Sequence, residues 1–421
     1  MTSRSHRFIS LLILASLGWP LMARDLTLPD AEALLVRNNR ELLAARRAVD
    51  SADAQGVIAG ARPNATLSLN TSGISGQSNL SSGPFSQARA DSVLRIDQPF
   101  ERGDKRDLRI GAASVLQRAA RNDALDVLRQ QLAQVRGGYY DLKQAQERAA
   151  VLAETAQLFA GTLAAAQVRL RAGDLASADV AKVQVDYERS QNDARAARAD
   201  LARAQLALGY LLGLETEASD LKAADTWPAA SRPEPGELER AVDARPDVIA
   251  ALARVEAADR LRDLARAQRT RDITVGAQVE RFPGSAPVNT VGLGVALPVF
   301  TGYDFAGEIQ KAEVDRYAAV DALAKTRALA TNELRRAGGD LDAAAERVER
   351  FDTSLLEAAN RSAQAAEFAF KRGAISVLEV LDGRRTLRAV RLEELAARGD
   401  YARALAAWRA AQTSAATLEG K

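Results

Sequence analysis

Proline is missing from two very long parts of the sequence, residues 100–227 and 299–421. Proline breaks a helix interior because it lacks a backbone N–H and clashes with the preceding turn, so either part can be helical almost throughout. At 1.5 Å per residue, residues 105–170 would form a helix of about 100 Å and residues 174–212 one of about 58 Å. These lengths exceed an ordinary globular core and predict long helical hairpins.

Both long parts carry small or apolar residues at helical spacing. The positions step by three and four residues, which is typical of a coiled-coil seam. They are Ala194, Ala197, Leu201, Ala204, Leu208 and Leu211 in the first part, and Ala397, Tyr401, Ala404, Trp408 and Ala411 in the second. Alanine lets helices approach closely but buries little area, so one hairpin alone would be weakly stable and needs neighbours.

Three pairs of segments show that the sequence repeats one plan at an offset near 200 residues. The pairs are "RLRAGDLASADV" (169–180) with "AFKRGAISVLEV" (369–380), "QPFERGDKRDLRI" (98–110) with "LPVFTGYDFAGEI" (297–309), and "NRELLAARRAVDSAD" (39–53) with "RPDVIAALARVEAAD" (245–259). Several independent landmarks at nearly one offset indicate a duplication.

The duplication divides the sequence into parts. Arg4 and Arg7 precede an apolar run that is too short to span a bilayer, which predicts a secretory signal peptide cleaved after Ala23. The expected parts are the signal peptide (1–23), a first repeat (24–225), a proline-containing linker (226–237) and a second repeat (238–421).

In each repeat the hydrophobic period changes from about 3.6 to 2 before the long helix, which predicts a β-hairpin with one apolar face. The expected strands cover about 64–72, 90–98, 272–280 and 289–297. Strands of about nine residues have the length of tilted membrane-spanning strands. A soluble hairpin that caps a helical bundle is the alternative.

Four strands cannot close on themselves into a barrel. An open strand edge cannot lie in lipid because its N–H and C=O groups would lack partners, so other copies must complete the wall. Three copies would supply twelve strands, an even number within the range of outer-membrane barrels. After the signal peptide the sequence has no run of about 18 apolar residues, so we expect no transmembrane helix.

The residue types exclude several kinds of chemistry. The sequence has no cysteine, and its only histidine, His6, lies in the signal peptide. Metal sites made of Cys or His, thiol nucleophiles, Ser-His-Asp triads and disulfides are therefore excluded. Without Arg4 and Arg7, 55 basic residues balance 55 acidic ones, so net charge does not indicate nucleic-acid binding. We expect no enzyme, no cofactor and no bound metal.

Over nearly the whole mature chain, this plan resembles the TolC-type outer-membrane efflux factors, and among them the CzcC-like branch for cation efflux. The resemblance rests on the duplication, on strand pairs followed by Pro-x-x-x-Gly, and on two helix corners. "GAISVLEVLDGRRTL" (373–387) is similar to the family's second corner. "QPFERGDKR" (98–106) resembles the stretch Glu-x-Gly-Gly-Lys-Arg of cation-efflux members, with Asp104 in place of the second glycine.

The resemblance implies a mainly α fold with membrane β-strands. Duplicated helix–β-hairpin–long-helix pairs would form a trimeric 12-stranded β-barrel on an α-helical periplasmic tunnel. The implied protein is a passive conduit in the outer membrane that extends into the periplasm. Its implied partners are a homotrimer of itself, outer-membrane lipid, a periplasmic adaptor (membrane fusion) protein and an inner-membrane pump of the RND type.

Heavy-metal cations are the cargo that the CzcC-like resemblance implies. The same conduit for drugs, solvents or secreted protein is an alternative. A periplasmic coiled-coil scaffold or adaptor with soluble hairpins is an alternative of another class.

The resemblance also implies a narrow pore aperture just beyond the second corner. The matching positions are Glu379 and Asp382, which lie on one helix face at i and i+3, and Asp179 in the first repeat, where Lys182 replaces the second acid. A threefold ring of carboxylates would attract cations and repel anions. Ordinary solvated charges on a helix are the alternative.

The corners and the strand ends are further candidate sites. Gly173 and Gly373 suit a tight or left-handed turn, and Leu175 and Ile375 follow as exposed apolar residues that would dock the adaptor or, alternatively, cap the helix pair. The candidate strand-to-helix junctions are Pro99 and Gly103 in the first repeat and Pro298 and Gly302 in the second.

Overall fold

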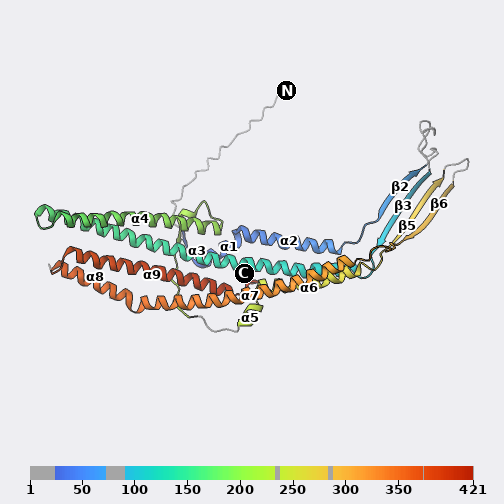
Figure 1. The fold of residues 1–421 in the computed structure, drawn as a ribbon. Coiled ribbons are helices and arrows are strands. Elements are labelled where there is room, and N and C mark those ends of the chain that lie inside the picture. Colours follow the sequence, from blue (N-terminus) through green and yellow to red (C-terminus); the bar gives the residue numbers. More distant parts are fainter. Residues whose placement is uncertain (1–23, 73–90, 233–237, 283–287, 373, 421) are drawn as a thin grey trace, which may run out of the picture. The chain divides into compact units, whose positions relative to one another are not determined.

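A computed structural model describes residues 24–72, 91–232, 238–282, 288–372 and 374–420 (Figure 1). The expected signal peptide, the loop between the first two strands, part of the expected linker and Gly373 lie outside the described residues. The described chain forms two compact units, and each unit takes segments from both sequence repeats.

The first repeat contains one of the two long helical hairpins. Its elements are β1 (Arg24–Leu26), α1 (Leu28–Asn38), α2 (Arg40–Gly60), β2 (Thr66–Ser72), β3 (Asp91–Phe100), α3 (Lys105–Ala172), α4 (Ser177–Leu212), a 3-10 turn (Ala218–Asp220) and β4 (Leu221–Ala223). The helix of 68 residues, α3, and the helix of 36 residues, α4, confirm the two long helices predicted from the absence of proline.

The second repeat follows the same order with an interruption in its long helix. Its elements are α5 (Leu238–Asp243), α6 (Pro246–Ala267), β5 (Ile273–Phe282), β6 (Val288–Ala296), α7 (Ala306–Arg350), a π-helical turn (Phe351–Leu355), α8 (Leu356–Lys371), α9 (Val377–Gln412) and α10 (Ala415–Leu418). The π turn inserts one wide turn where α3 of the first repeat runs on without a break.

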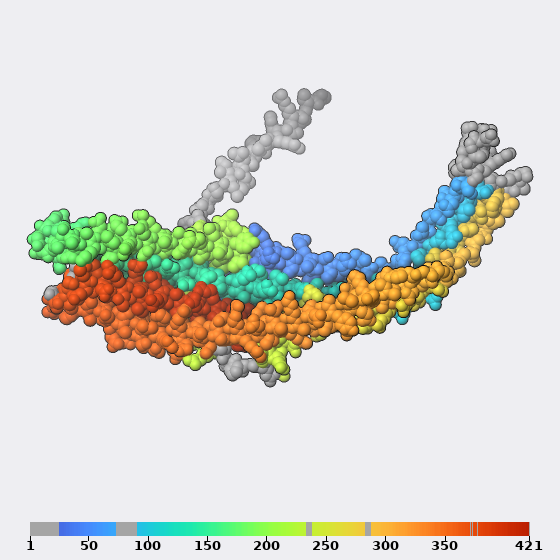
Figure 2. Space-filling view, viewed as in Figure 1, coloured from blue at the N-terminus to red at the C-terminus, as the bar shows by residue number. Residues whose placement is uncertain are grey.

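The first compact unit, here called the corner unit, comprises the described residues of Met1–Arg37, Val135–Ala230 and Arg347–Arg403. It contains the end of α3 hairpinned with α4, and α8 hairpinned with most of α9 (Figure 1). Its apolar core includes a small-residue layer in which Leu152 and Ala156 pack with Ala194 and Ala197. Figure 2 shows the surfaces of α4 (green) and α9 (red) lying against one another.

The predicted coiled-coil seam is confirmed, because all eleven of its positions are buried or half-buried. Leu208 and Tyr401 are almost completely inaccessible to solvent. The short parallel pair β1–β4 lies in the same unit, where the Tyr139 hydroxyl donates a hydrogen bond to the Leu26 carbonyl at 2.9 Å. Burial raises the pKa of Tyr139, which keeps this hydroxyl a donor.

The second compact unit, here called the sheet unit, comprises Asn38–Gln134, Ser231–Glu346 and Ala404–Lys421. Its four strands form one antiparallel sheet in the order β2-β3-β5-β6 (Figure 1). The strands lie within two residues of the predicted bounds at each end. Both edge strands, β2 and β6, pair on one side only within the described residues.

The sheet unit fixes the shorter helix of each repeat by a buried polar residue at its N-cap. Asn39 caps α2 by accepting from the Leu42 N–H at 3.1 Å, and its amide donates to Gln131 of α3 at 3.2 Å. At the matching position Arg245 precedes α6 and donates to Glu333 of α7 at 2.9 Å. One repeat therefore uses a neutral hydrogen bond, whereas the other uses an ion pair between the buried Arg245 and the exposed Glu333.

One helix bears on the expectation that the chain has no transmembrane helix. Helix α3 contains an 18-residue window that is apolar enough, by composition and length, for a membrane span. The amino-acid sequence does not show it as a continuous apolar run, because isolated polar residues interrupt the window. Only 28% of the window is buried within the chain, and the whole helix is about 100 Å long, several times the thickness of a bilayer. An apolar, incompletely covered strip on a much longer helix suits contact with further helices.

Candidate functional site: corners, junctions and sheet faces

The first helix corner is a left-handed glycine turn. Gly173 has a φ of +82°, which a residue with a side chain rarely adopts. The Gly173 N–H donates to the Leu170 carbonyl at 3.1 Å, and the Asp174 N–H donates to the Arg169 carbonyl at 2.9 Å, so the last carbonyls of α3 are satisfied. In the second repeat the Ala374 N–H donates to the Ala369 carbonyl at 2.9 Å in the same pattern.

The apolar residues that follow the corners are less exposed than the sequence suggested. Leu175 and Ile375 were expected to be exposed, but both are half-buried. Leu175 packs against a buried cluster made of Phe159, Ala166, Val180, Val183 and Leu381. The turn folds this side chain back over the helix pair, so capping accounts for at least part of its role.

The three candidate aperture carboxylates lie in different environments. Asp179 forms an ion pair with Lys182 at 3.3 Å. Glu379 accepts from the Ser376 N–H at 2.8 Å, and the Glu379 N–H donates to the Ser376 hydroxyl at 3.4 Å, which is a capping box at the start of α9. The Asp382 side chain is exposed, and its carboxylate forms no hydrogen bond or ion pair with any described residue. Of the three carboxylates, Asp382 is therefore the one without a polar side-chain contact within the described chain.

Sequence reasoning missed a row of arginines that joins the two hairpins of the corner unit. Arg385 and Arg388 of α9 form ion pairs with Asp186 and Asp193 of α4. The Asp186 side chain is only 9% exposed, so this charge depends on its partner. The row of arginines in 384–391 was visible in the sequence, but the acids lie almost 200 residues away and required the fold.

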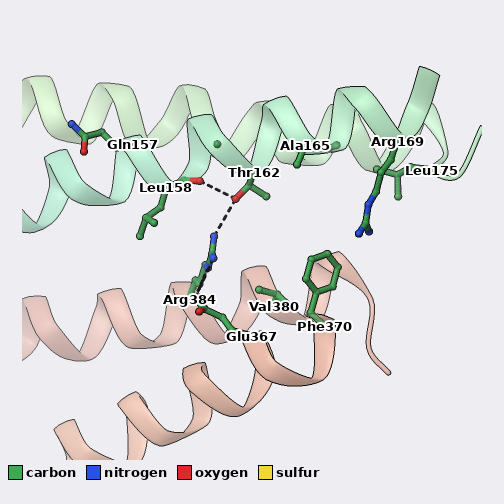
Figure 3. Close-up of a pocket in the computed structure, with 12 residues that line it drawn as sticks. Gln157, Leu158, Thr162, Ala165, Arg169, Leu175, Glu367, Phe370, Val380 and Arg384 are labelled. Carbon is green, nitrogen blue, oxygen red and sulfur yellow. Dashed lines mark hydrogen bonds and ion pairs between the residues drawn. The ribbon is translucent and has the colours of Figure 1, made fainter. Parts of the chain in front are cut away.

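A groove of about 420 Å³ lies between the same hairpins, close to the corners (Figure 3). Its walls are mainly apolar and come from α3, α8 and α9, with Leu158, Ala165 and Phe370 among the lining residues. Arg384 reaches across it and donates to the Thr162 hydroxyl at 3.1 Å (Figure 3). At one end the Arg169 guanidinium lies 5.0 Å from the centre of the Phe370 ring.

The first strand-to-helix junction uses two left-handed residues in succession. Gly103 has a φ of +72° and Asp104 a φ of +57°. A Cβ at Gly103 would lie 2.7 Å from the Thr270 Cβ, so both the backbone and the space require glycine. Asp104 occupies a conformation that aspartate tolerates better than most residues, which explains how it replaces the second glycine of the related motif.

The charged residues around Gly103 tie the two repeats together. The Lys105 side chain is 5% exposed, and its Nζ donates to the Thr270 carbonyl and to Asp272 Oδ1, both at 2.8 Å. Arg109 forms an ion pair with Glu101, and its hydrogen bonds lower the pKa of this carboxyl. The motif at 101–106 therefore links β3 and α3 to residues 270–272, which directly precede β5.

The second junction has a different construction. Pro298 and Gly302 precede α7, but Gly302 does not have a left-handed φ, and a Cβ there would meet open space. The left-handed residue is Phe305, with a φ of +66°, and its ring packs edge-on against Phe300 at 5.2 Å. Sequence alignment of the two glycines did not reveal this difference.

The two faces of the sheet differ in polarity. Paired positions on one face are large and exposed to solvent: Leu67, Leu69, Leu94, Ile96, Val275, Val279, Val291, Leu293 and Val295. The opposite face carries mostly polar, charged and glycine residues, among them Ser68, Asn70, Arg95, Asp97, Gln278, Glu280 and Thr290. This alternation is that of a strand with lipid on one side and water on the other.

Among the described residues, no group of three or more His, Cys, Asp or Glu side chains is arranged to hold a metal ion.

Glu101→Gln should make the thermal stability of the protein depend less on pH in acidic solution. Because the folded-state pKa of Glu101 lies below its ordinary value of 4.5, the ionised carboxyl stabilises the fold above that pH and loses this effect as the pH falls through the lowered pKa. We expect the wild type to lose more thermal stability than the variant between about pH 5 and pH 3, measured by circular dichroism.

Glu357→Gln, which removes an exposed carboxylate from α8, is the matched control. An equal loss of thermal stability on acidification in the wild type and in Glu101→Gln would contradict the prediction.

Comparison with known sequences gives one family, which matches most of the chain. The profile called "Outer membrane efflux protein" matches residues 33–214 and 238–412, one segment for each repeat. The chain is 26% identical over 378 residues to the cobalt-zinc-cadmium resistance protein CzcC of Cupriavidus metallidurans, which covers 90% of this chain and 87% of that protein.

Solved structures share the fold at low sequence identity. The CmeC outer membrane channel of Campylobacter jejuni matches with a TM-score of 0.78 and 16% identity, over 91% of this chain and 85% of that one. The outer membrane protein VceC of Vibrio cholerae matches with a TM-score of 0.73 and 18% identity, over 92% and 96% of the two chains.

Proposed function

Because the chain belongs to the outer membrane efflux protein family, we propose that it is the outer-membrane component of a tripartite export system and works as a homotrimer. The protein is an efflux channel of the outer membrane that extends into the periplasm, and it is a conduit and not an enzyme. The number of copies, the partners and the cargo are the parts that we propose.

The observation that best supports a trimer is the open four-stranded sheet. Its apolar residues face outward without cover, and its edge strands β2 and β6 each lack a second partner within the described chain. In lipid those edge groups need partners, and β6 of one copy can pair with β2 of the next in the same antiparallel alternation. Three copies would give twelve strands, an even number within the range of known barrels.

A periplasmic scaffold with soluble hairpins, the alternative of another class, fits this sheet poorly. Nine large apolar side chains on one face of the strands are between 43% and 86% exposed. A soluble protein rarely exposes a continuous apolar surface of this kind.

The proposed partners at the other end are a periplasmic adaptor protein and an inner-membrane pump of the RND type. The groove beside Leu158, Ala165 and Phe370 lies next to the corners and is apolar enough to receive a helical hairpin tip. Leu175 lines the groove. Gly173 and Ile375 belong to the corners beside it, and Gly373, which lies outside the described residues, stays a predicted docking residue on the sequence alone. The half-burial of Leu175 and Ile375 makes the groove wall, and not these two side chains alone, the main docking surface.

Heavy-metal cations are the proposed cargo. The resistance protein CzcC is named for cobalt, zinc and cadmium, and it aligns with most of this chain. Asp382 would add an exposed carboxylate from each copy near the inner end of the conduit. Drugs, solvents or secreted protein remain the alternative cargo, because the pump and not the conduit selects what enters.

The assembly is tested on the purified full-length protein. We expect a mass of three chains in detergent by light scattering, and stepwise conductance in planar bilayers. A monomer that stays in aqueous solution without detergent and forms no channels would overturn the proposal. Loss of metal resistance in a deletion strain, without a change in drug sensitivity, would favour cations over the other cargo.

Asp382→Asn should weaken block of the channel by a divalent cation applied from the periplasmic side. Removing one charge from each of three copies in a narrow aperture should lower the blocking affinity on the order of tenfold. Lys182→Gln, which frees Asp179 from its ion pair, is the opposing variant and should strengthen the block. Unchanged blocking affinity in both variants would rule out an aperture at this level.

Ala165→Trp should abolish export while leaving channel conductance intact. Ala165 is exposed in the groove wall, so an indole there fills the space offered to the adaptor without disturbing the core. Cross-linking to the adaptor in cells and metal resistance are the readouts, and Ala165→Ser is the size control. Normal cross-linking and resistance in Ala165→Trp would place the adaptor elsewhere.

A further inference from the structure

An arginine on the polar face of the sheet contacts side chains of its own strand and of the neighbouring strand. Arg95 of β3 donates from Nε to both oxygens of Asp97, at 2.9 and 2.8 Å, and from Nη1 to Gln278 of β5 at 3.5 Å. Arg95 and Asp97 are two residues apart on one strand and therefore share a face. The Arg95 side chain is 35% exposed and the Asp97 side chain 24% exposed.

Glycines beneath this pair create the space that it occupies. A Cβ added to Gly276 would collide with Asp97 Oδ1 and would lie 3.1 Å from Arg95 Nη2. Gly294, which pairs with Gly276 across β5 and β6, would bring a Cβ to 3.7 Å from the same nitrogen. Glycine inside a strand weakens it and often marks a close approach by other atoms. Here the approaching atoms belong to the Arg95–Asp97 pair.

The pair has a consequence for charge on this face. Among the described strand residues, the ionisable side chains on the polar face are Asp91, Arg95, Asp97 and Glu280. With Arg95 bound to Asp97, the pair is neutral and the fixed charge comes from Asp91 and Glu280. Without the Asp97 carboxylate, the Arg95 guanidinium would instead add one uncompensated positive charge to this face from every copy.

We propose that Arg95, Asp97 and the Gly276–Gly294 pair form a neutral clamp on the lumen wall that sets the ion selectivity and the local free width of the membrane barrel. This inference rests on the proposed trimeric barrel, in which the polar face of the sheet lines the lumen. Asp97 cancels the charge that would repel cations, and the glycines let the long arginine side chain lie against the wall. The barrel then carries a net negative lining that suits the passage of cations.

A charge cycle at Arg95 and Asp97 tests the selectivity. In planar bilayers with a potassium chloride gradient, Asp97→Asn should shift the cation-to-anion permeability ratio toward anions by roughly twofold or more, and Arg95→Gln should shift it toward cations. The double variant Arg95→Gln/Asp97→Asn restores neutrality and should return the ratio to the wild-type value. Equal ratios in all four proteins would overturn the clamp as a selectivity element.

A second variant tests the space beneath the clamp. Gly276→Val should push the pair into the lumen and lower single-channel conductance, whereas Ala277→Val, on the lipid-facing side of the same strand, should not. Adding Arg95→Ala and Asp97→Ala to Gly276→Val should recover the conductance. If Gly276→Val does not assemble, the triple variant should restore assembly. Failure of that rescue, or normal conductance in Gly276→Val, would contradict the proposal.

These measurements distinguish a failure of the proposed conduit from a failure of the proposed clamp. If the wild type forms no channels, the trimeric conduit itself is wrong. If the wild type conducts and the charge and space variants behave like it, the conduit stands and only the clamp is wrong.

Discussion

Backbone hydrogen bonding at the sheet edges is the constraint on which the rest of the protein depends. In lipid, an unpaired N–H or C=O costs several kcal/mol, so a four-stranded sheet with two open edges cannot be a finished membrane structure. The long helices share this dependence, because their alanine-rich seams bury little area per residue. In the proposed trimer neighbouring copies meet both needs, since they supply strands that pair with the open sheet edges and helix surfaces that cover the seams.

The sequence was most informative where one residue type controls the backbone. The absence of proline predicted α3 and α4, the period-2 segments placed the four strands within two residues, and Gly173 marked a left-handed corner. These features depend on local sterics and on side-chain alternation, which short windows of sequence contain in full. The duplication helped further, because the same element could be predicted separately from each of the two repeats.

Features that depend on distant partners could not be predicted. Asp186 pairs with Arg385 at a separation of 199 residues, and nothing near Asp186 indicates that its charge is buried. The matched glycines Gly103 and Gly302 predicted equivalent junctions, yet the space beside Gly103 is limited by Thr270 whereas Gly302 is open. The degree of exposure of Leu175 likewise depended on how the turn folds back onto a cluster drawn from three helices.

The two repeats have kept their apolar spacing and diverged in their polar contacts, and this divergence limits the symmetry of any assembly. Asn39 with Gln131 is a neutral pair, whereas Arg245 at the matching position is charged and pairs with Glu333. At the corners, Asp179 is offset by Lys182, while Asp382 has no such partner. Three duplicated chains could place six similar helix pairs around an axis, but the charges repeat only once per chain. The electrostatic field inside the proposed conduit would therefore have threefold symmetry, with the second repeat supplying most of the negative charge at its inner end.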